Sequence, residues 1–545
     1  MYYVVTECTL RGVTSYMNIN ERISGLRKNH GISQEKLSEA LRVSRQAVQK
    51  WETGTALPDI VNLIELARFF NVSLDYLVGG RDNRETEQQR LHKIAVPEYT
   101  KMNDWELYSS NMKTEYRQCI DEGLDAEFLQ DIMSSLDKIP KSRYKERIAD
   151  CVFNIINELD EKPGYKYTEP SDKETIFMLS SPVKRTDFCM GEKELKNKLK
   201  GAFMGRTAGC LLGKPVEGIA ADDLERFLRQ SENYPLSRYI KRSDVTPKTT
   251  EGVLFDLESR RDFADMVSCA PCDDDTNYTV LSSIVVDEYG RNFTATDVGA
   301  VWIARQTRDA YCTAERVAYK NLINGYQPPD TALFKNPFRE WIGAQIRADY
   351  YGYINPGDVK SAADMAFCDA SLSHIKNGIY GAMWVAAMIA KAGVSENIRE
   401  IIDAGLSVIP KTSRFYEHIK RVVAEFDSGL SAKDIKNAVY SRFDVTQWVH
   451  TLPNAEIVTA ALLIGNGDFE KSICAAVSMG YDTDCNGATV GSVLGMSIGA
   501  DALPDKWMSV LGDTQDTSIF GVGKIKFDSL VERALKHIKD KKESE

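Results

Sequence analysis

The chain has 545 residues, too many for one hydrophobic core and enough for two or three domains, because single cores stop growing near roughly 250 to 300 residues. Its 43% hydrophobic and 27% charged content is typical of a globular protein, and no apolar run approaches the roughly 18 residues that a membrane span needs. The net charge of −11 argues against a protein that coats nucleic acid along its whole length. We therefore expect a modular protein with no membrane role.

The eleven cysteines are odd in number and scattered through apolar segments, which is typical of reduced thiols and predicts a cytoplasmic location. Cys269 and Cys272 form a lone CxxC pair. With neither a second pair nor nearby histidines, two buried thiols are favoured over a zinc or redox site. Residues 1–16 lack the basic start and apolar centre of a secretory signal. Because regular patterning begins at Met17, we expect the protein to start there rather than at Met1.

Apolar residues at helical spacing predict five short amphipathic helices between residues 19 and 80. Ser33 and Ser44 are candidate N-caps, since a serine hydroxyl accepts a hydrogen bond from the first turn of the helix that follows it. The second of these caps begins a helix over residues 45–53. Trp51 continues the apolar face of that helix, so it is expected in the core rather than against a base.

Two stretches of this region resemble the Xre or lambda-repressor-like helix-turn-helix family, GISQEKLSEALRVSRQAVQKWETGTALPD and LIELARFFNVSLDYLVGG. The resemblance implies a DNA-binding domain over residues 17–80, with its recognition helix at residues 45–50, and a homodimer that reads a palindrome. Glutamine can bond adenine and arginine guanine with two contacts each, and helix N-termini favour phosphates. For each side chain, a solvated surface role is the alternative. The residues implied to contact DNA are Gln34, Ser44, Arg45, Gln46, Gln49 and Lys50.

A polar, charged run, RDNRETEQQR, follows residue 80 and predicts a linker with a domain boundary near residue 82. Helical patterning returns over residues 104–160, where the expected apolar faces are Phe128, Ile132 and Leu136, then Ile148, Val152, Ile155 and Ile156. Residues 81–190 are therefore predicted to form a linker and a helical accessory region that packs against the next domain.

Three separated segments carry the residues best suited to catalysis. The first, residues 201–218, is a helix pattern dense in small residues that ends in a Lys-Pro-Val-Glu turn. The second places three aspartates and a threonine, residues 273–276, at the start of an apolar helix, and the third places Asp482 and Asp484 before another. A glycine in a helix interior costs roughly 1 kcal/mol relative to alanine. Close contact with another helix or a ligand is therefore expected along Gly487, Gly491, Gly495 and Gly499.

Two acidic clusters brought together without a counter-ion would repel each other and raise each other's pKa, and a divalent cation removes that penalty. All-oxygen ligands from Asp and Thr suit hard ions such as Mg²⁺, Mn²⁺ or Ca²⁺ rather than zinc, and the chain has only six histidines. Helix capping alone explains either cluster taken singly, because Asp and Thr are common N-caps. The glycine repeat is what favours a metal site.

In order and character the three segments resemble the ADP-ribosylglycohydrolase family over about residues 195–540. The family's Thr-Asp-Asp-Thr motif is matched by residues 273–276, with aspartate in place of the first threonine. Its Asp-Thr-Asp-Thr motif is matched by residues 482–485, with a thiol in place of the last hydroxyl. The resemblance implies an all-α bundle with two Mg²⁺ ions, or Mn²⁺. The implied metal ligands are Asp273, Asp274, Asp275, Asp482, Asp484 and Cys485.

Further matches to the family lie outside the metal motifs. Glu217 falls where some members hold a glutamate near the scissile bond, and a surface turn residue is the alternative. For His374 the alternative is a satisfied core histidine. Tyr350 stands where the family's Gly-Ala-x-x-Arg-x-x-Pro stretch has its proline. The residues implied to bind substrate are His374, Gly343, Arg347 and Gly480.

The resemblance and the chemistry together predict hydrolysis of an ADP-ribosyl N- or O-glycosidic bond through an oxocarbenium-like state, with release of ADP-ribose. Asp274 is the first choice for the general base and Glu217 the second. One alternative is a transcriptional regulator that senses ADP-ribose or another nucleotide through a catalytically inactive hydrolase-like domain. Another is an enzyme for a different N-glycoside, such as a small-molecule ADP-ribosyl adduct. No motif encodes the leaving group or the operator sequence.

Overall fold

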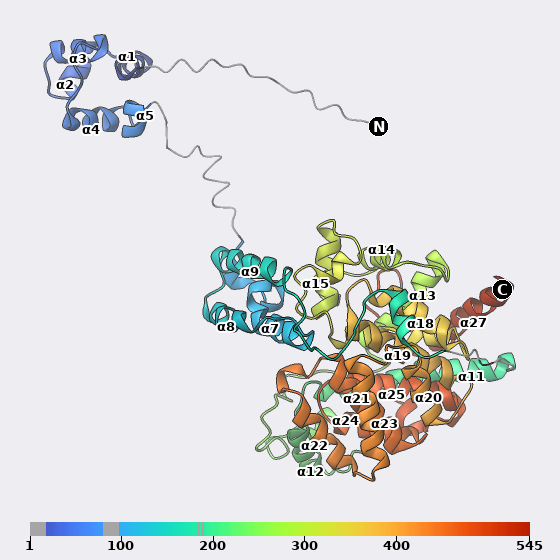
Figure 1. Ribbon diagram of the computed structural model, residues 1–545. Helices are drawn as coiled ribbons and strands as arrows, with labels where there is room; N and C mark the ends of the chain where they lie inside the picture. The colour runs from blue at the N-terminus through green and yellow to red at the C-terminus, as the bar shows by residue number, and fades with distance from the viewer. Residues whose placement is uncertain (1–17, 80–96, 183–185, 187–189, 545) are drawn as a thin grey trace. The chain divides into compact units, whose positions relative to one another are not determined.

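A computed structural model describes residues 18–79, 97–182, 186 and 190–544. The chain divides into two compact units, Met1–Tyr99 and Thr100–Glu545. The expected start at Met17 and the expected linker run lie outside the described residues. In the described residues of both units nearly all the regular secondary structure is helical, which confirms the all-α prediction (Figure 1). Among the described helices, none is long and apolar enough to cross a membrane.

The N-terminal unit contains the five predicted helices: α1 (Ile19–Asn29), α2 (Gln34–Ala40), α3 (Arg45–Thr53), α4 (Ile60–Phe69) and α5 (Leu74–Gly79). The Ser33 and Ser44 hydroxyls cap α2 and α3, as predicted, by accepting hydrogen bonds from the backbone N–H groups of Lys36 and Ala47. Trp51 is 5% exposed and lies in the core of this unit, which confirms its expected packing role.

The accessory region of the C-terminal unit has a small core of its own, formed by α7 (Met112–Asp121), α8 (Gln130–Lys138) and α9 (Arg143–Ile156). Its expected apolar faces are wrong in part. Leu136, Val152 and Ile156 are buried, but the exposed residues include Phe128, Ile132, Ile148 and Ile155. Steps of four residues drift around a helix with 3.6 residues per turn. The buried face of α8 therefore follows steps of four and then three residues, through Leu129, Met133 and Leu136.

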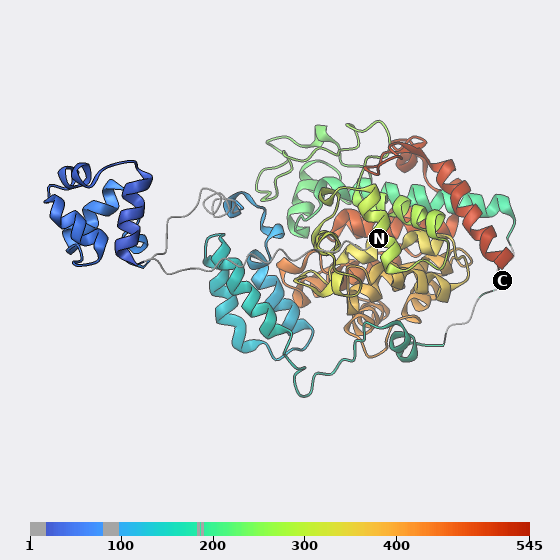
Figure 2. The ribbon, with the colours of Figure 1, turned by 90° about the horizontal axis from the view of Figure 1, so that it is seen from above.

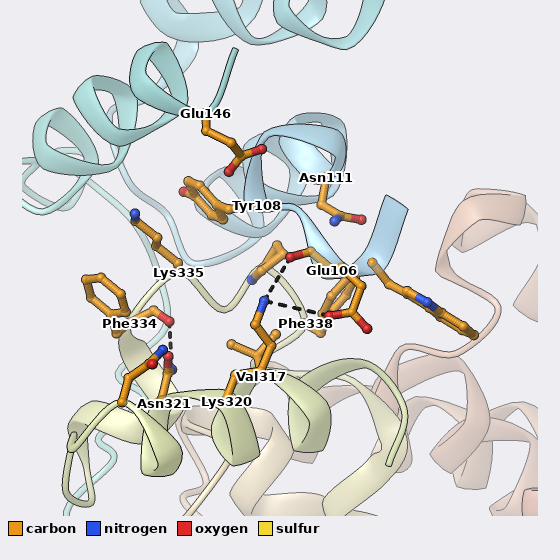
Figure 3. Close-up of a pocket in the computed structure, with 13 residues that line it drawn as sticks. Glu106, Tyr108, Asn111, Glu146, Val317, Lys320, Asn321, Phe334, Lys335 and Phe338 are labelled. Carbon is orange, nitrogen blue, oxygen red and sulfur yellow. Dashed lines mark hydrogen bonds and ion pairs between the residues drawn. The ribbon is translucent and has the colours of Figure 1, made fainter. Parts of the chain in front are cut away.

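Buried ion pairs join the accessory region to the rest of the unit, as its expected packing requires. Arg339 donates hydrogen bonds to Glu115 at 2.7 Å and to Glu122 at 2.6 Å. Arg316 pairs with Glu106 at 2.7 Å. A cavity of about 220 Å³ lies at this junction, where the Lys320 Nζ donates to the Glu106 carbonyl oxygen at 2.8 Å (Figure 3).

The remaining helices of the C-terminal unit are α10 (Lys173–Leu179), α11 (Glu192–Gly213), α12 (Ala221–Gln230), α13 (Asp274–Tyr289), α14 (Ala295–Arg305), α15 (Thr313–Ile323), α16 (Asp330–Leu333), α17 (Asp349–Tyr353), α18 (Val359–Ala370), α19 (Lys376–Ala392), α20 (Ile398–Leu406), α21 (Arg414–Asp427), α22 (Ala432–Arg442), α23 (Thr451–Gly465), α24 (Phe469–Ser478), α25 (Thr483–Ile498), α26 (Asp505–Met508) and α27 (Phe527–Ser544). Short 3-10 turns include η5 (Lys214–Val216), η8 (Ile342–Arg347) and η9 (Val445–Gln447). The described strands, β1 (Thr514–Gln515) and β2 (Ile525–Lys526), form one antiparallel pair.

Buried helices form the centre of this unit. Almost every residue of α19 is buried, and α23 and α25 are similarly enclosed, which is typical of helices that are apolar on all sides. The long helix α11 lies beside α25 and runs antiparallel to it (Figure 2). This central pair of helices positions the candidate site.

Candidate active site

Paired glycines hold α11 and α25 in contact along their length. A Cβ added to Gly205 would stand closest to the carbonyl oxygen of Gly491, and one added to Gly491 would meet that of Gly205. The same reciprocal approach joins Gly201 to Gly495 and Gly209 to Gly487. The predicted close contact is therefore with another helix, and its partner is the first small-residue segment. Gly499, with φ 80, ends α25 and also approaches α11, because a Cβ on it would meet the Asn197 side chain at 2.5 Å.

This antiparallel packing brings the start of α25 to the end of α11. The Thr483 hydroxyl donates to the Gly213 carbonyl oxygen at 2.8 Å, and the Gly218 N–H donates to the Tyr481 carbonyl oxygen at 2.9 Å. Arg206 of α11 holds the start of α13 in the same place, since its Nε donates to the Asp275 carbonyl oxygen at 2.7 Å. All three segments singled out in the sequence therefore meet at one site.

The two acidic motifs share this site. One carboxylate oxygen from each of Glu217, Asp482 and Asp484 lies within 4.8 Å of the other two. Two further groups of the same size each include a thiol: Asp275 with Asp484 and Cys485, and Cys210 with Asp273 and Asp275. Asp274 is partly buried beside them and belongs to none of the three groups.

Protein cations neutralise only part of this charge. Lys214 pairs with Asp273, the Arg206 Nη2 pairs with Asp275 at 3.1 Å, and Arg260 pairs with Glu217 at 3.5 Å. Among the described residues, no ion pair reaches the other three carboxylates, Asp274, Asp482 and Asp484. The Asp275 Oδ2 atom is buried and receives no hydrogen bond. The cluster therefore carries negative charge that no protein cation balances. Divalent cations could balance it, and its oxygen donors suit them.

The pKa values reflect this crowding. Burial, followed by the charge of Glu217, raises the pKa of Asp482 to about 7 and holds the pKa of Asp484 well above its usual value. Burial, followed by the charge of Asp273, also raises the pKa of Glu217. Burial opposes ionisation of Asp273 as well, but the Lys214 ammonium outweighs it and lowers the pKa of Asp273. Half of the six carboxylates, Asp274, Asp482 and Asp484, therefore have no ion-pair partner among the described residues.

A second buried cluster gathers three of the expected substrate-binding residues around Glu315 of α15. Arg347 donates to the Glu315 Oε1 at 2.6 Å, the His374 Nε2 lies 3.9 Å from the same oxygen, and a Cβ on Gly343 would overlap this carboxylate. Arg347 also donates to Ser373 at 2.8 Å and is 1% exposed, so its guanidinium is bound within the protein.

Gly480 has φ 74 and lies against the Tyr440 hydroxyl, in the loop that leads into the second acidic motif. Tyr440 stacks on Tyr481 with ring centroids 4.4 Å apart. In the structure, Gly480 therefore serves to turn the chain toward Asp482, because a left-handed φ favours glycine.

Several residues of the site were absent from the predictions. Arg206, Cys210 and Lys214 lie between the small residues of α11 and η5, and nothing in the pattern distinguishes them. Glu315 has no sequence signal at all. The prediction of two buried thiols in the CxxC pair is wrong for Cys272, which is exposed, whereas Cys269 is partly buried. Cys272 lies in the loop before α13, outside the apolar core, which accounts for its exposure.

The expected DNA-binding side chains lie mostly on the surface of the N-terminal unit. Arg45, Gln46, Gln49 and Lys50 are exposed on α3. Gln34 is partly buried at the start of α2, where its Nε2 donates to the Glu52 carboxylate at 2.8 Å. Its side-chain amide is therefore already engaged within the protein.

Two family models match the chain. Residues 191–543 match the model described as ADP-ribosylglycohydrolase, and residues 23–77 match the model described as helix-turn-helix. The transcriptional activator BcrR of Enterococcus faecalis is 39% identical over 66 residues, which cover 12% of this chain and 32% of BcrR. The chain thus spans about a third of the length of that relative.

Two further comparisons cover more than half of the chain. An uncharacterised protein of Archaeoglobus fulgidus is 21% identical over 324 residues, which cover 59% of this chain and 93% of that protein. A solved structure titled ADP-ribosylglycohydrolase-related protein complex has 16% identity and a TM-score of 0.41, and the match covers 64% of this chain and 99% of that one.

Proposed function

The chain belongs to the ADP-ribosylglycohydrolase family and carries a helix-turn-helix domain, and from this premise we propose that it hydrolyses an ADP-ribosyl N- or O-glycosidic bond and releases ADP-ribose. The observation that carries the proposal is that two acidic motifs, about 200 residues apart in sequence, meet in one cluster. An oxygen of Asp275 from the first motif lies within 4.8 Å of one of Asp484 from the second. A helix-capping role alone gives no reason for the two motifs to share one buried cluster.

Two Mg²⁺ ions, or Mn²⁺ in their place, fit the cluster. The residues that would hold them are Asp273, Asp274, Asp275, Asp482, Asp484 and Cys485. Support comes from the unpartnered Asp275 Oδ2 and from the carboxylates without a cation partner. When bound, such ions lower the pKa of a water and orient it.

The chain's own carboxylates would handle the proton and the developing charge. Asp274, at the first turn of α13, would accept the proton of the attacking water. Glu217 is the second choice, since its side chain is 34% exposed and its raised pKa suits proton exchange with solvent. The surrounding carboxylates would stabilise the oxocarbenium-like state at the anomeric carbon.

His374, Gly343, Arg347 and Gly480 are proposed to shape the substrate pocket. Because the Arg347 guanidinium is bound to Glu315 and Ser373, its proposed part is to position those groups. The N-terminal unit is proposed to bind a specific operator through the exposed face of α3. The homodimer and the cytoplasmic location stay predictions.

The test is release of ADP-ribose by the full-length protein from a panel of ADP-ribosylated proteins, nucleic acids and small molecules. We expect release from at least one class with Mg²⁺ or Mn²⁺, and none with excess chelator. Ligand binding without release from any class would contradict the enzyme and favour the nucleotide-sensing regulator, in which Cys485 accompanies a loss of turnover.

A further inference from the structure

Two buried thiols belong to the carboxylate cluster. Cys210 of α11 is 2% exposed and Cys485 of α25 is 7% exposed. Each has one sulfur within 4.8 Å of an oxygen of Asp275, which belongs to both thiol-containing groups. The sequence did not predict a role for Cys210, because it stands among the small residues of α11, where no pattern distinguishes it.

The third group of the cluster contains oxygen donors only, from Glu217, Asp482 and Asp484. Asp484 also belongs to the Cys485 group, so one carboxylate is shared between the oxygen-only side of the cluster and the sulfur-containing side. The cluster is therefore asymmetric in donor chemistry. Carboxylates suit Mg²⁺ and Mn²⁺, whereas thiolates select borderline-soft ions such as Zn²⁺.

We propose that the two cation positions are unlike: an oxygen-only position at Asp482 and Asp484, beside Glu217, and a mixed sulfur and oxygen position at Asp275, Asp484 and Cys485 that takes a thiophilic divalent cation. This inference rests on the metal site of the proposed function and replaces Mg²⁺ or Mn²⁺ by a thiophilic ion at one of its two positions. Asp484 would join the two positions. Each thiol that ligates gives up its proton to solvent, since the thiolate is the ligand.

The buried Asp275 carboxylate supports the mixed position. Its side chain is fully buried, and Arg206 satisfies Oδ1 at 3.1 Å, but Oδ2 has no hydrogen-bond partner. An unpartnered buried carboxylate oxygen is costly, and a cation beside it would offset that cost. The Cys485 sulfur and an Asp484 oxygen, which both lie within 4.8 Å of an oxygen of Asp275, are the donors that complete such a position.

Cobalt is a suitable probe, because thiolate ligation gives Co²⁺ a sulfur-to-metal charge-transfer band in the near ultraviolet that oxygen ligands do not give. The full-length, reduced, metal-free protein is titrated with Co²⁺ in the presence of excess Mg²⁺, which fills the oxygen-only position. We expect the band to reach its plateau at one Co²⁺ per chain. Absence of the band in the wild-type protein would overturn the mixed position.

Serine variants assign the sulfurs. C485S should lose the band, and C210S, which removes the sulfur of the separate group with Asp273 and Asp275, should keep it. The matched control is C474S, because Cys474 is also 7% exposed but lies on α24 outside the cluster, and its band should equal the wild type. A band that survives undiminished in the folded C485S variant, judged by circular dichroism, would contradict the assignment.

The outcome is separable from that of the proposed hydrolase. Release of ADP-ribose with Mg²⁺ alone and no cobalt band would leave the enzyme and remove the mixed position. A thiol-dependent band without any hydrolysis would leave the mixed position and remove the enzyme.

Discussion

Gly209 of α11 and Gly487 of α25 approach so closely that a Cβ on either residue would overlap the carbonyl oxygen of the other. The backbones of the two helices are therefore in direct contact one turn away from the candidate metal cluster. This contact fixes where α25 begins, and hence where Asp482 and Asp484 lie relative to the end of α11.

Alanine at Gly209 or Gly487 should destabilise the C-terminal unit. Each methyl group would meet backbone, which cannot rotate away, so the helices must separate, at a cost of roughly 1 to 3 kcal/mol or more. Urea unfolding measures this. Gly299→Ala is the control, because its Cβ would meet only side chains, at 3.1 Å or more, and alanine gains about 1 kcal/mol of helix propensity. Equal midpoints for Gly209→Ala and Gly299→Ala would contradict the backbone contact.

The sequence predicted this contact only in part. The spacing of Gly487, Gly491, Gly495 and Gly499 indicated a close approach, but the identity of the partner depends on the antiparallel direction of α11, which no local pattern encodes. The acidic motifs were found because they stand at helix starts, and the glycine repeat favoured a metal site over helix capping alone. Glu315 escaped notice because its role depends on Arg347, which lies 32 residues further along the chain.

Asparagine at Asp482 or Asp484 should abolish metal-dependent hydrolysis and weaken metal binding by more than about 100-fold, since changes at partners of ligands already cost roughly 10- to 100-fold. Calorimetric titration with Mn²⁺ and an ADP-ribose release assay give the two readouts. Asp501→Asn is the matched control, because Asp501 is exposed near the far end of α25. Undiminished turnover in either site variant would remove the proposed mechanism.

The buried Arg414 is expected to be essential for docking of the accessory region. Its Nη2 donates to Glu169 at 2.7 Å and to both oxygens of Glu340 at 2.8 Å. Arg414→Met would leave two buried carboxylates without their cation, at roughly 3 to 5 kcal/mol. Arg421→Met removes a more exposed pair with Glu417 and should cost less than about 1 kcal/mol. Thermal unfolding distinguishes the two, and similar losses would argue against the buried network.

His450 should make the C-terminal unit less stable in acid. Burial lowers its pKa to about 3, whereas a histidine in the unfolded chain titrates near 6.5. Between these values the unfolded chain binds the extra proton, so stability falls as the pH falls, by at most about 1.4 kcal/mol per pH unit. The Leu452 N–H donates to the His450 Nδ1 at 3.2 Å. His450→Asn keeps an acceptor for this N–H and removes the ionisable imidazole. Unfolding measured from pH 7 to 4.5 should show a shallower slope in this variant, and an unchanged slope would contradict the assignment.

Arg45 should carry part of the sequence preference of the N-terminal unit. It stands at the first position of α3, its side chain is 62% exposed, and its partner is the exposed Glu35 at 3.2 Å, a pair weak enough to be exchanged for a base. Arg45→Ala should weaken binding to an operator selected from random duplexes by about 1 to 3 kcal/mol, roughly 5- to 150-fold. Fluorescence anisotropy at fixed salt gives the affinity. Arg68→Ala, an exposed change on α4, is the control and should lose little. Since a phosphate contact would weaken all duplexes alike, an equal loss on unrelated DNA would show that Arg45 positions the domain instead of reading a base.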